Sequence, residues 1–167
     1  MGMPARLANP EVLIPIRDAI MHASATVAAS SLEPEIGHLV SLRASQLNGC
    51  AFCLSMHVRE LREDGWPEDK IAVLPAWRET DWFTPRERAA LAWTEALTHI
   101  DPHGVSDDVF ATASTAFSEE ELAMLTLEVI AINGWNRVNI AFHTTPDHWE
   151  SPALTETNRS HHQAVAD

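Results

Sequence analysis

The sequence has few basic residues, and this shortage restricts the partners that the protein can bind. Eleven Lys and Arg residues stand against 24 Asp and Glu residues, which gives a formal net charge of -13 at pH 7. Binding to nucleic acid or to anionic lipid needs clustered Lys and Arg side chains. The charge therefore argues against both kinds of partner and predicts a soluble acidic protein.

Long apolar segments and cysteines are also scarce. Residues 1–9 do not join a basic stretch to an apolar run, as a signal peptide would. No run approaches the roughly 18 consecutive apolar residues of a membrane span. We therefore expect a cytoplasmic protein, in which disulfides are usually catalytic or transient. Cys50 and Cys53 are so close in sequence that a bond between them closes too small a loop to stabilise a fold. Redox chemistry or metal binding remains for them.

No segment alternates between apolar and polar residues as a strand would, whereas helix start and stop signals recur. Thr84 with Glu87, and Ser118 with Glu121, have the spacing of capping boxes. We expect an all-α fold in one domain, residues 1–149. The expected helices cover about 10–28, 34–48, 50–64 and 119–142. Shorter helices are expected after Pro67 and from Ser106. Another is expected to start at the Thr84 capping box and to carry an apolar stripe from Ala90 to Ile100. Residues 150–167 are polar and predict a flexible or subunit-wrapping tail.

The segment Asn48-Gly49-Cys50-Ala51-Phe52-Cys53 predicts an activated thiol pair. Asn48 can cap a helix and Gly49 permits a tight entry, so both cysteines fall in the first turn. The positive end of the helix dipole there favours a thiolate. Positions three apart share a helix face, so the two sulfur atoms can join as a disulfide. His57 lies one turn after Cys53, where an imidazole can take up and return the thiol proton.

Two other interpretations of these residues stay open. Both cysteines can be small core residues, with His57 a surface histidine. Cys50, Cys53 and His57 can also supply three zinc ligands, with His38 or His143 as the fourth. Four other histidines lie in expected loops or in the tail and are interpreted as solvated: His103, His148, His161 and His162.

The stretch LVSLRASQLNGCAFC, from Leu39 to Cys53, followed by Met56-His57, resembles the signature of the alkylhydroperoxidase AhpD-like proteins of the carboxymuconolactone decarboxylase superfamily. The resemblance continues at AWRET (76–80), RERAALAW (86–93) and INGWNR (132–137), and covers roughly residues 10–142. It implies an AhpD-like helical bundle that assembles as a trimer or hexamer. Decarboxylases of the superfamily lack the cysteine pair, so that activity is a poor fit.

The resemblance also implies a thiol-dependent peroxidase without a bound cofactor or metal. Cys50 and Cys53 match the redox pair and His57 matches the relay histidine. A dithiol donor, either a lipoylated or a thioredoxin-like protein, would recycle the pair. Peroxidatic members carry a glutamate twelve residues before the first cysteine, where this chain has His38. A histidine can pass a proton but supplies no fixed negative charge, and Glu35, one turn earlier, is a candidate to supply it.

We expect the Cys53 thiolate to attack the peroxide and Cys50, at the helix tip, to be easier for a reductant to reach. A protein thiol-disulfide oxidoreductase, a non-catalytic redox sensor and a metal-binding module are the alternatives. Two groups of residues on the expected helices have less specific roles. The amides of Asn133, Asn136 and Asn139 are expected to bond neighbouring helices or to line a pocket. The tryptophans are expected to anchor the core or a subunit contact: Trp77, Trp82, Trp93 and Trp135.

Overall fold

The computed structural model describes residues 5–146; the predicted tail, residues 150–167, and the histidines at 148, 161 and 162 lie outside this range. Helices follow one another without a strand between residues 5 and 146, which confirms the all-α prediction. The elements are η1 (Pro10–Leu13), α1 (Ile14–Ala28), α2 (Pro34–Asn48), α3 (Ala51–Glu63), α4 (Glu68–Ala72), η2 (Leu74–Glu79), α5 (Pro85–Thr98), α6 (Asp107–Ala116) and α7 (Glu119–Phe142).

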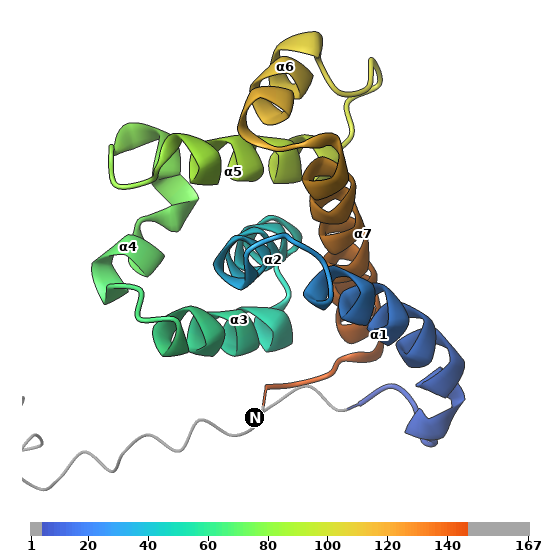
Figure 1. Ribbon diagram of the computed structural model, residues 1–167. Helices are drawn as coiled ribbons and strands as arrows, with labels where there is room; N and C mark the ends of the chain where they lie inside the picture. The colour runs from blue at the N-terminus through green and yellow to red at the C-terminus, as the bar shows by residue number, and fades with distance from the viewer. Residues whose placement is uncertain (1–4, 147–167) are drawn as a thin grey trace, which may run out of the picture.

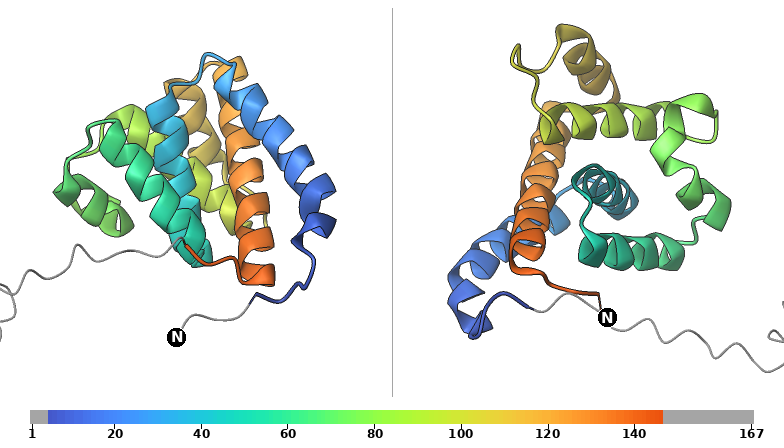
Figure 2. Two further views of the ribbon diagram at one scale, coloured as in Figure 1. Left: turned by 90° about the horizontal axis from the view of Figure 1, so that it is seen from below. Right: turned by 180° about the vertical axis from the view of Figure 1, so that it is seen from behind.

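Helix α2 occupies the centre of the molecule. In Figure 1 it is seen nearly end-on, with α3 below it, α4 to the left, α5 above and α7 to the right. Helix α1 packs along the outside of α7, and α6 covers the junction of α5 and α7 (Figures 1 and 2). Helix α7 therefore contacts α2 and α3 on one side and α1 on the other.

The apolar faces of these helices meet in three clusters. One joins α1, α2, α5, α6 and α7 around Val40, Ala90 and Leu125, which are fully buried. A second joins α2, α3, η2 and α5 and contains Trp77. The third is small and lies where α3 meets α2 and α7: Ala44, Cys50, Cys53 and Ile132. Burial of a large apolar side chain stabilises the fold by about 1.5–3 kcal/mol. Within residues 5–146, none of the helices is long and apolar enough to cross a membrane.

Both predicted capping boxes are present. The side chains of Thr84 and Ser118 accept hydrogen bonds from the amides of Glu87 and Glu121, and both glutamates return the contact to the cap amide. These boxes fix the first turns of α5 and α7. One expectation was wrong at the other end of α5, because the helix ends at Thr98 and Ile100 lies beyond it with 64% of its surface exposed.

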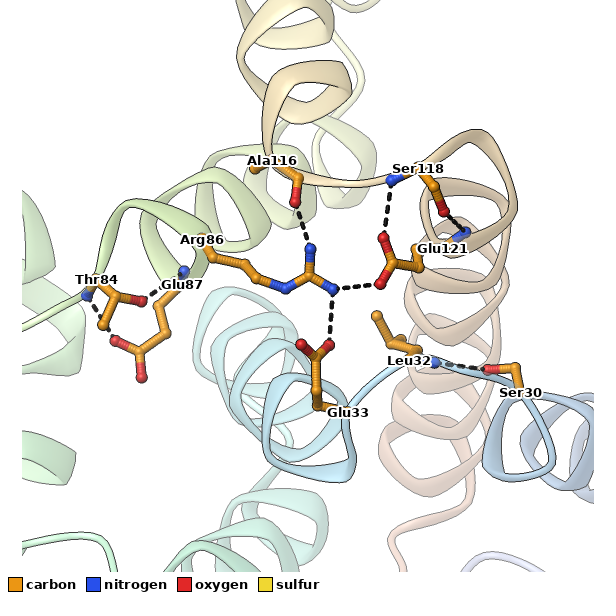
Figure 3. Close-up of polar contacts among 9 residues, drawn as sticks. All are labelled: Ser30, Leu32, Glu33, Thr84, Arg86, Glu87, Ala116, Ser118 and Glu121. Carbon is orange, nitrogen blue, oxygen red and sulfur yellow. Dashed lines mark hydrogen bonds and ion pairs between the residues drawn. The ribbon is translucent and has the colours of Figure 1, made fainter.

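Arg86 connects the starts of α2, α5 and α7, as Figure 3 shows. Its Nη2 donates to Glu33 at 2.8 Å and to Glu121 at 2.7 Å, and its Nη1 donates to the carbonyl of Ala116. Glu33 is the N-cap residue of α2 and Glu121 belongs to the capping box of α7. Charge-assisted bonds of this kind are stronger than neutral ones. Arg86 therefore fixes the start of α2 against the two helices that flank it.

Candidate functional site

The two cysteines lie where α2 turns into α3. Gly49 ends α2 with φ +70, in the left-handed region that favours glycine. Cys50 is itself the N-cap residue of α3, and its Sγ accepts a hydrogen bond from the amide of Cys53 at 3.4 Å. Asn48 does not cap α3, contrary to the sequence-based expectation.

Asn48 instead belongs to a partly buried cluster of polar side chains from α2 and α7. Its Nδ2 donates to the Oδ1 atoms of Asn133 at 3.0 Å and of Asn136 at 2.8 Å. Asn136 is fully buried and donates to Ser45 Oγ at 3.0 Å. These bonds satisfy amides that would be expensive to bury unpaired. The expectation that Asn133 and Asn136 bond neighbouring helices is therefore confirmed.

Cys50 and Cys53 are joined as a disulfide, with their Cα atoms 5.4 Å apart. The expectation that Cys50 is easier to reach was wrong, because Cys50 is 1% and Cys53 0% exposed. Cys50 packs in the small cluster with Ala44 and Ile132. Cys53 differs in that it lines a cavity and receives a hydrogen bond from Asn139 Nδ2 at 3.4 Å. The two sulfur atoms are therefore equally buried but have different surroundings.

His57 is buried one turn after Cys53 and pairs with a carboxylate. Its Nδ1 lies 2.6 Å from Glu60 Oε2. Its Nε2 is buried with no hydrogen-bond partner among residues 5–146. Partial burial alone would raise the pKa of Glu60, but the hydrogen bond with His57 and nearby positive charge lower this pKa overall. A carboxylate on Nδ1 favours the tautomer with a basic Nε2. The His57–Glu60 pair was missed from the sequence, although three residues is a contact spacing on a helix.

His38 occupies the position at which the resemblance leads one to expect a glutamate. Its Nδ1 lies 2.6 Å from Asp64 Oδ2, at the C-terminal end of α3. Glu35, the candidate replacement, is exposed near the start of α2. The carboxylates beside the two histidines are therefore Glu60 of α3 and Asp64, the residue that caps the end of α3.

A cavity of about 660 Å³ connects these groups. Its walls come from α1, α2, α3 and α7 and are mostly apolar, with Met21, Val27, Phe52, Met56 and Trp135 among them. Cys53, His38, His57 and Glu60 line it as well. Pockets of roughly 300–1,000 Å³ accommodate small organic ligands. Trp135 therefore lies on the cavity wall, while Trp77 and Trp93 are core residues and Trp82 is half exposed.

The cavity also contains residues that the sequence did not bring to notice. Glu128 of α7 lines it and accepts a hydrogen bond from Ser41 of α2 at 2.5 Å. Its signal in the sequence is an acidic residue on the apolar stripe of α7.

As for metals, no cluster of three or more His, Cys, Asp or Glu side chains suited to an ion occurs within residues 5–146.

Comparison with known proteins identifies the family. The family model described as "Carboxymuconolactone decarboxylase family" matches residues 16–96, which contain α2, α3 and both cysteines. A crystal structure from Agrobacterium tumefaciens is 39% identical, covers 87% of this chain and 99% of that chain, and has a TM-score of 0.81. That protein is described as one of unknown function and as a candidate antioxidant defence protein AhpD. The chain belongs to the carboxymuconolactone decarboxylase family, among its AhpD-like members.

Other proteins extend this comparison. YdfG of Bacillus subtilis, described as uncharacterized, is 39% identical over 112 residues, which make up 67% of this AhpD-like chain and 76% of YdfG. The debrominase Bmp8, solved with 2,3,4-tribromopyrrole, has a TM-score of 0.68 at 18% identity and covers 92% of this chain and 77% of its own. At that identity the likeness shows a common fold.

Proposed function

We propose that this chain is a thiol-dependent peroxidase that reduces organic hydroperoxides with Cys53 and Cys50. The observation that carries the proposal is the position of Cys53, which is bonded to Cys50 and lines the same cavity as His57 and Glu60. A mostly apolar cavity supports an organic substrate over hydrogen peroxide, which needs little room.

In the proposed reaction His57, held by Glu60, takes the proton from the Cys53 thiol. The thiolate attacks the terminal oxygen of the hydroperoxide, an S–O bond forms and the O–O bond breaks. This leaves a sulfenic acid on Cys53 and an alkoxide, which becomes an alcohol at the expense of the proton that His57 took up. The Cys50 thiol then attacks the sulfenic acid, water leaves, and the disulfide of Cys50 and Cys53 forms. Two electrons from an external dithiol restore both thiols by exchange.

Both cysteines are buried and only Cys53 lines the cavity, so the electron donor would reach the disulfide at Cys53, through the cavity. A dithiol on a long flexible side chain, as on a lipoylated protein, can enter the cavity more readily than a dithiol on a broad protein surface. The same burial makes a general protein thiol-disulfide oxidoreductase the weaker candidate. The family relationship supports a cytoplasmic homo-oligomer. Half-exposed apolar side chains on α1 and α7, namely Ile14, Met21 and Ile140, support the self-association.

The test measures peroxide consumption by reduced protein supplied with dihydrolipoamide, with cumene hydroperoxide and hydrogen peroxide compared. We expect faster turnover of cumene hydroperoxide by the wild type and none by Cys53→Ser. Cys50→Ser should consume one equivalent and retain a sulfenic acid that dimedone traps. Reduced protein alkylated at both thiols is the control. Full turnover by both cysteine variants would refute the proposed function, and oxidation without turnover would favour a redox sensor.

A further inference from the structure

Glu128 is an acidic residue on the inward-facing side of α7, next to buried apolar residues. It lies on α7 between Leu125 and Ile132, both of which are buried in the core. The side chain lines the cavity that Cys53 and His57 also line. Its Oε1 accepts a hydrogen bond from Ser41 Oγ across the contact between α2 and α7. A carboxyl group is thus brought to the cavity by a helix other than the one that carries the cysteines.

The surroundings of Glu128 favour a neutral acid. Within residues 5–146, its carboxyl has no ion pair with a Lys or Arg side chain. Partial burial raises the pKa of Glu128, while the hydrogen bond from Ser41 acts in the opposite direction. Even partial burial of an acid without a cation is unfavourable, so an apolar residue would give a more stable helix contact. Acids kept in such places are candidates for function.

Several charged or titratable groups share the cavity with Glu128, and they come from each packed helix. Arg17 lies on α1, Glu33 and His38 are at the start of α2, and His57 and Glu60 are on α3. Of these, His57 and Glu60 form the hydrogen-bonded pair described above, and His57 serves as the base in the proposed reaction. A base and an acid from different helices therefore border the same space.

We propose that Glu128 is the general acid of this site and protonates the oxygen that leaves the hydroperoxide. The inference rests on the proposed peroxidase function. Attack by the Cys53 thiolate on the terminal oxygen releases an alkoxide, and Glu128 gives this alkoxide its proton to form the alcohol. Sulfur is oxidised and the peroxide is reduced by the same two electrons. The proton that His57 took from the Cys53 thiol then passes to the Glu128 carboxylate, so that the number of protons balances.

The choice of peroxide separates acid catalysis from a structural role. An alkyl hydroperoxide loses a strongly basic alkoxide, which needs a proton, whereas a peroxycarboxylic acid loses a carboxylate, which needs none. Positioned general acids contribute roughly 10²–10⁴-fold. We therefore expect Glu128→Gln to slow oxidation of reduced protein by tert-butyl hydroperoxide at least about 100-fold. The same variant should react with perbenzoic acid at nearly the wild-type rate.

The experiment follows tryptophan fluorescence in stopped flow over a range of pH, because Trp135 lines the cavity. Wild-type oxidation by the alkyl hydroperoxide should weaken as the pH rises past the point at which Glu128 ionises, and this limb should be absent in Glu128→Gln. Glu120→Gln, an exposed position on the same helix, is the matched control and should behave as the wild type. Glu128→Asp, which keeps an acid, should recover part of the rate and the pH limb.

Equal losses with both peroxides, or no loss with either, would overturn the role of Glu128 while wild-type turnover leaves the proposed function standing. If Glu128→Gln does not fold, the Glu128→Asp variant decides by the same ratio of the two peroxides. A wild-type protein that neither peroxide oxidises would refute the peroxidase function and this inference together.

Discussion

The hydrogen bond from Asn139 to Cys53 leads to a prediction about how readily the reduced site forms a thiolate. Asn139 Nδ2 lies 3.4 Å from Cys53 Sγ, and both residues are buried. A donor next to sulfur favours the charged form over the neutral thiol. Asn139→Ala removes this donor and puts nothing polar in its place, so the thiolate should become less populated.

The size of the effect follows from the strength of such bonds. A hydrogen bond to a charged group is worth about 1.5–3 kcal/mol. Its loss should lower the ratio of thiolate to thiol at Cys53 roughly 10- to 150-fold at a given pH. Oxidation by peroxide at neutral pH should slow by a similar factor wherever thiol and not thiolate dominates, because the thiolate is the nucleophile.

The assay is the ultraviolet absorbance of the thiolate, followed against pH in a Cys50→Ser background with a single titrating thiol. The chain contains no tyrosine, so phenolate absorbance does not overlap the signal. Asn133→Ala is the matched control, since Asn133 is on the same helix and bonds Asn48 and Thr98. An unchanged titration in Asn139→Ala, or the same change in both variants, would show that the bond to sulfur does not stabilise the thiolate.

Three further changes test other parts of the structure. Glu60→Gln removes the carboxylate that orients His57, so oxidation of the reduced protein should slow about 10- to 100-fold, measured in stopped flow. An unaltered rate would show that Glu60 is not needed to orient His57. Asn136→Ala breaks two interhelical hydrogen bonds and should lower the free energy of unfolding by about 2–4 kcal/mol in urea; a loss below about 1 kcal/mol would contradict the role of the polar cluster. Burial alone would raise the pKa of Glu95, but three hydrogen bonds from its neighbours lower it below 4.5. Glu95 therefore stabilises the fold above about pH 4.5 and loses this effect as the pH falls through the lowered pKa. Glu95→Gln should be destabilised at neutral pH, and the difference from wild type in thermal melts should shrink in acid.

Helix starts could be predicted from the sequence because capping is local. Thr84 and Ser118 contact residues only three positions away, so the spacing alone carries the information. The same holds for the turn at Gly49 and for the pairing of Cys50 with Cys53. The end of α5 was less predictable, because Ile100 continues the apolar stripe in sequence but lies after the helix has ended.

Contacts between helices were much harder to predict. Asparagine is a common N-cap residue, so the sequence suggested a cap at Asn48. Its contacts with Asn133 and Asn136 depend on the packing of α7 against α2. Burial of Cys50 likewise depends on packing around the start of α3. Glu128 and Ser41 are 87 positions apart, so no local pattern joins them. The one available signal was an acidic residue on an apolar stripe, which breaks the expected pattern at a site of interest.

The central position of α2 has a consequence for how the molecule opens. The Arg86 contacts hold its first turn, and the amide cluster at Asn48 holds its last. Segments enclosed in this way exchange their amide hydrogens with solvent only when much of the structure unfolds. His38 and Ser41 therefore sit on the backbone that fluctuates least. Helix α1 lies on the outside of the molecule and forms another wall of the cavity, so a movement that widens the cavity at this wall would leave the inner helix α2 in place.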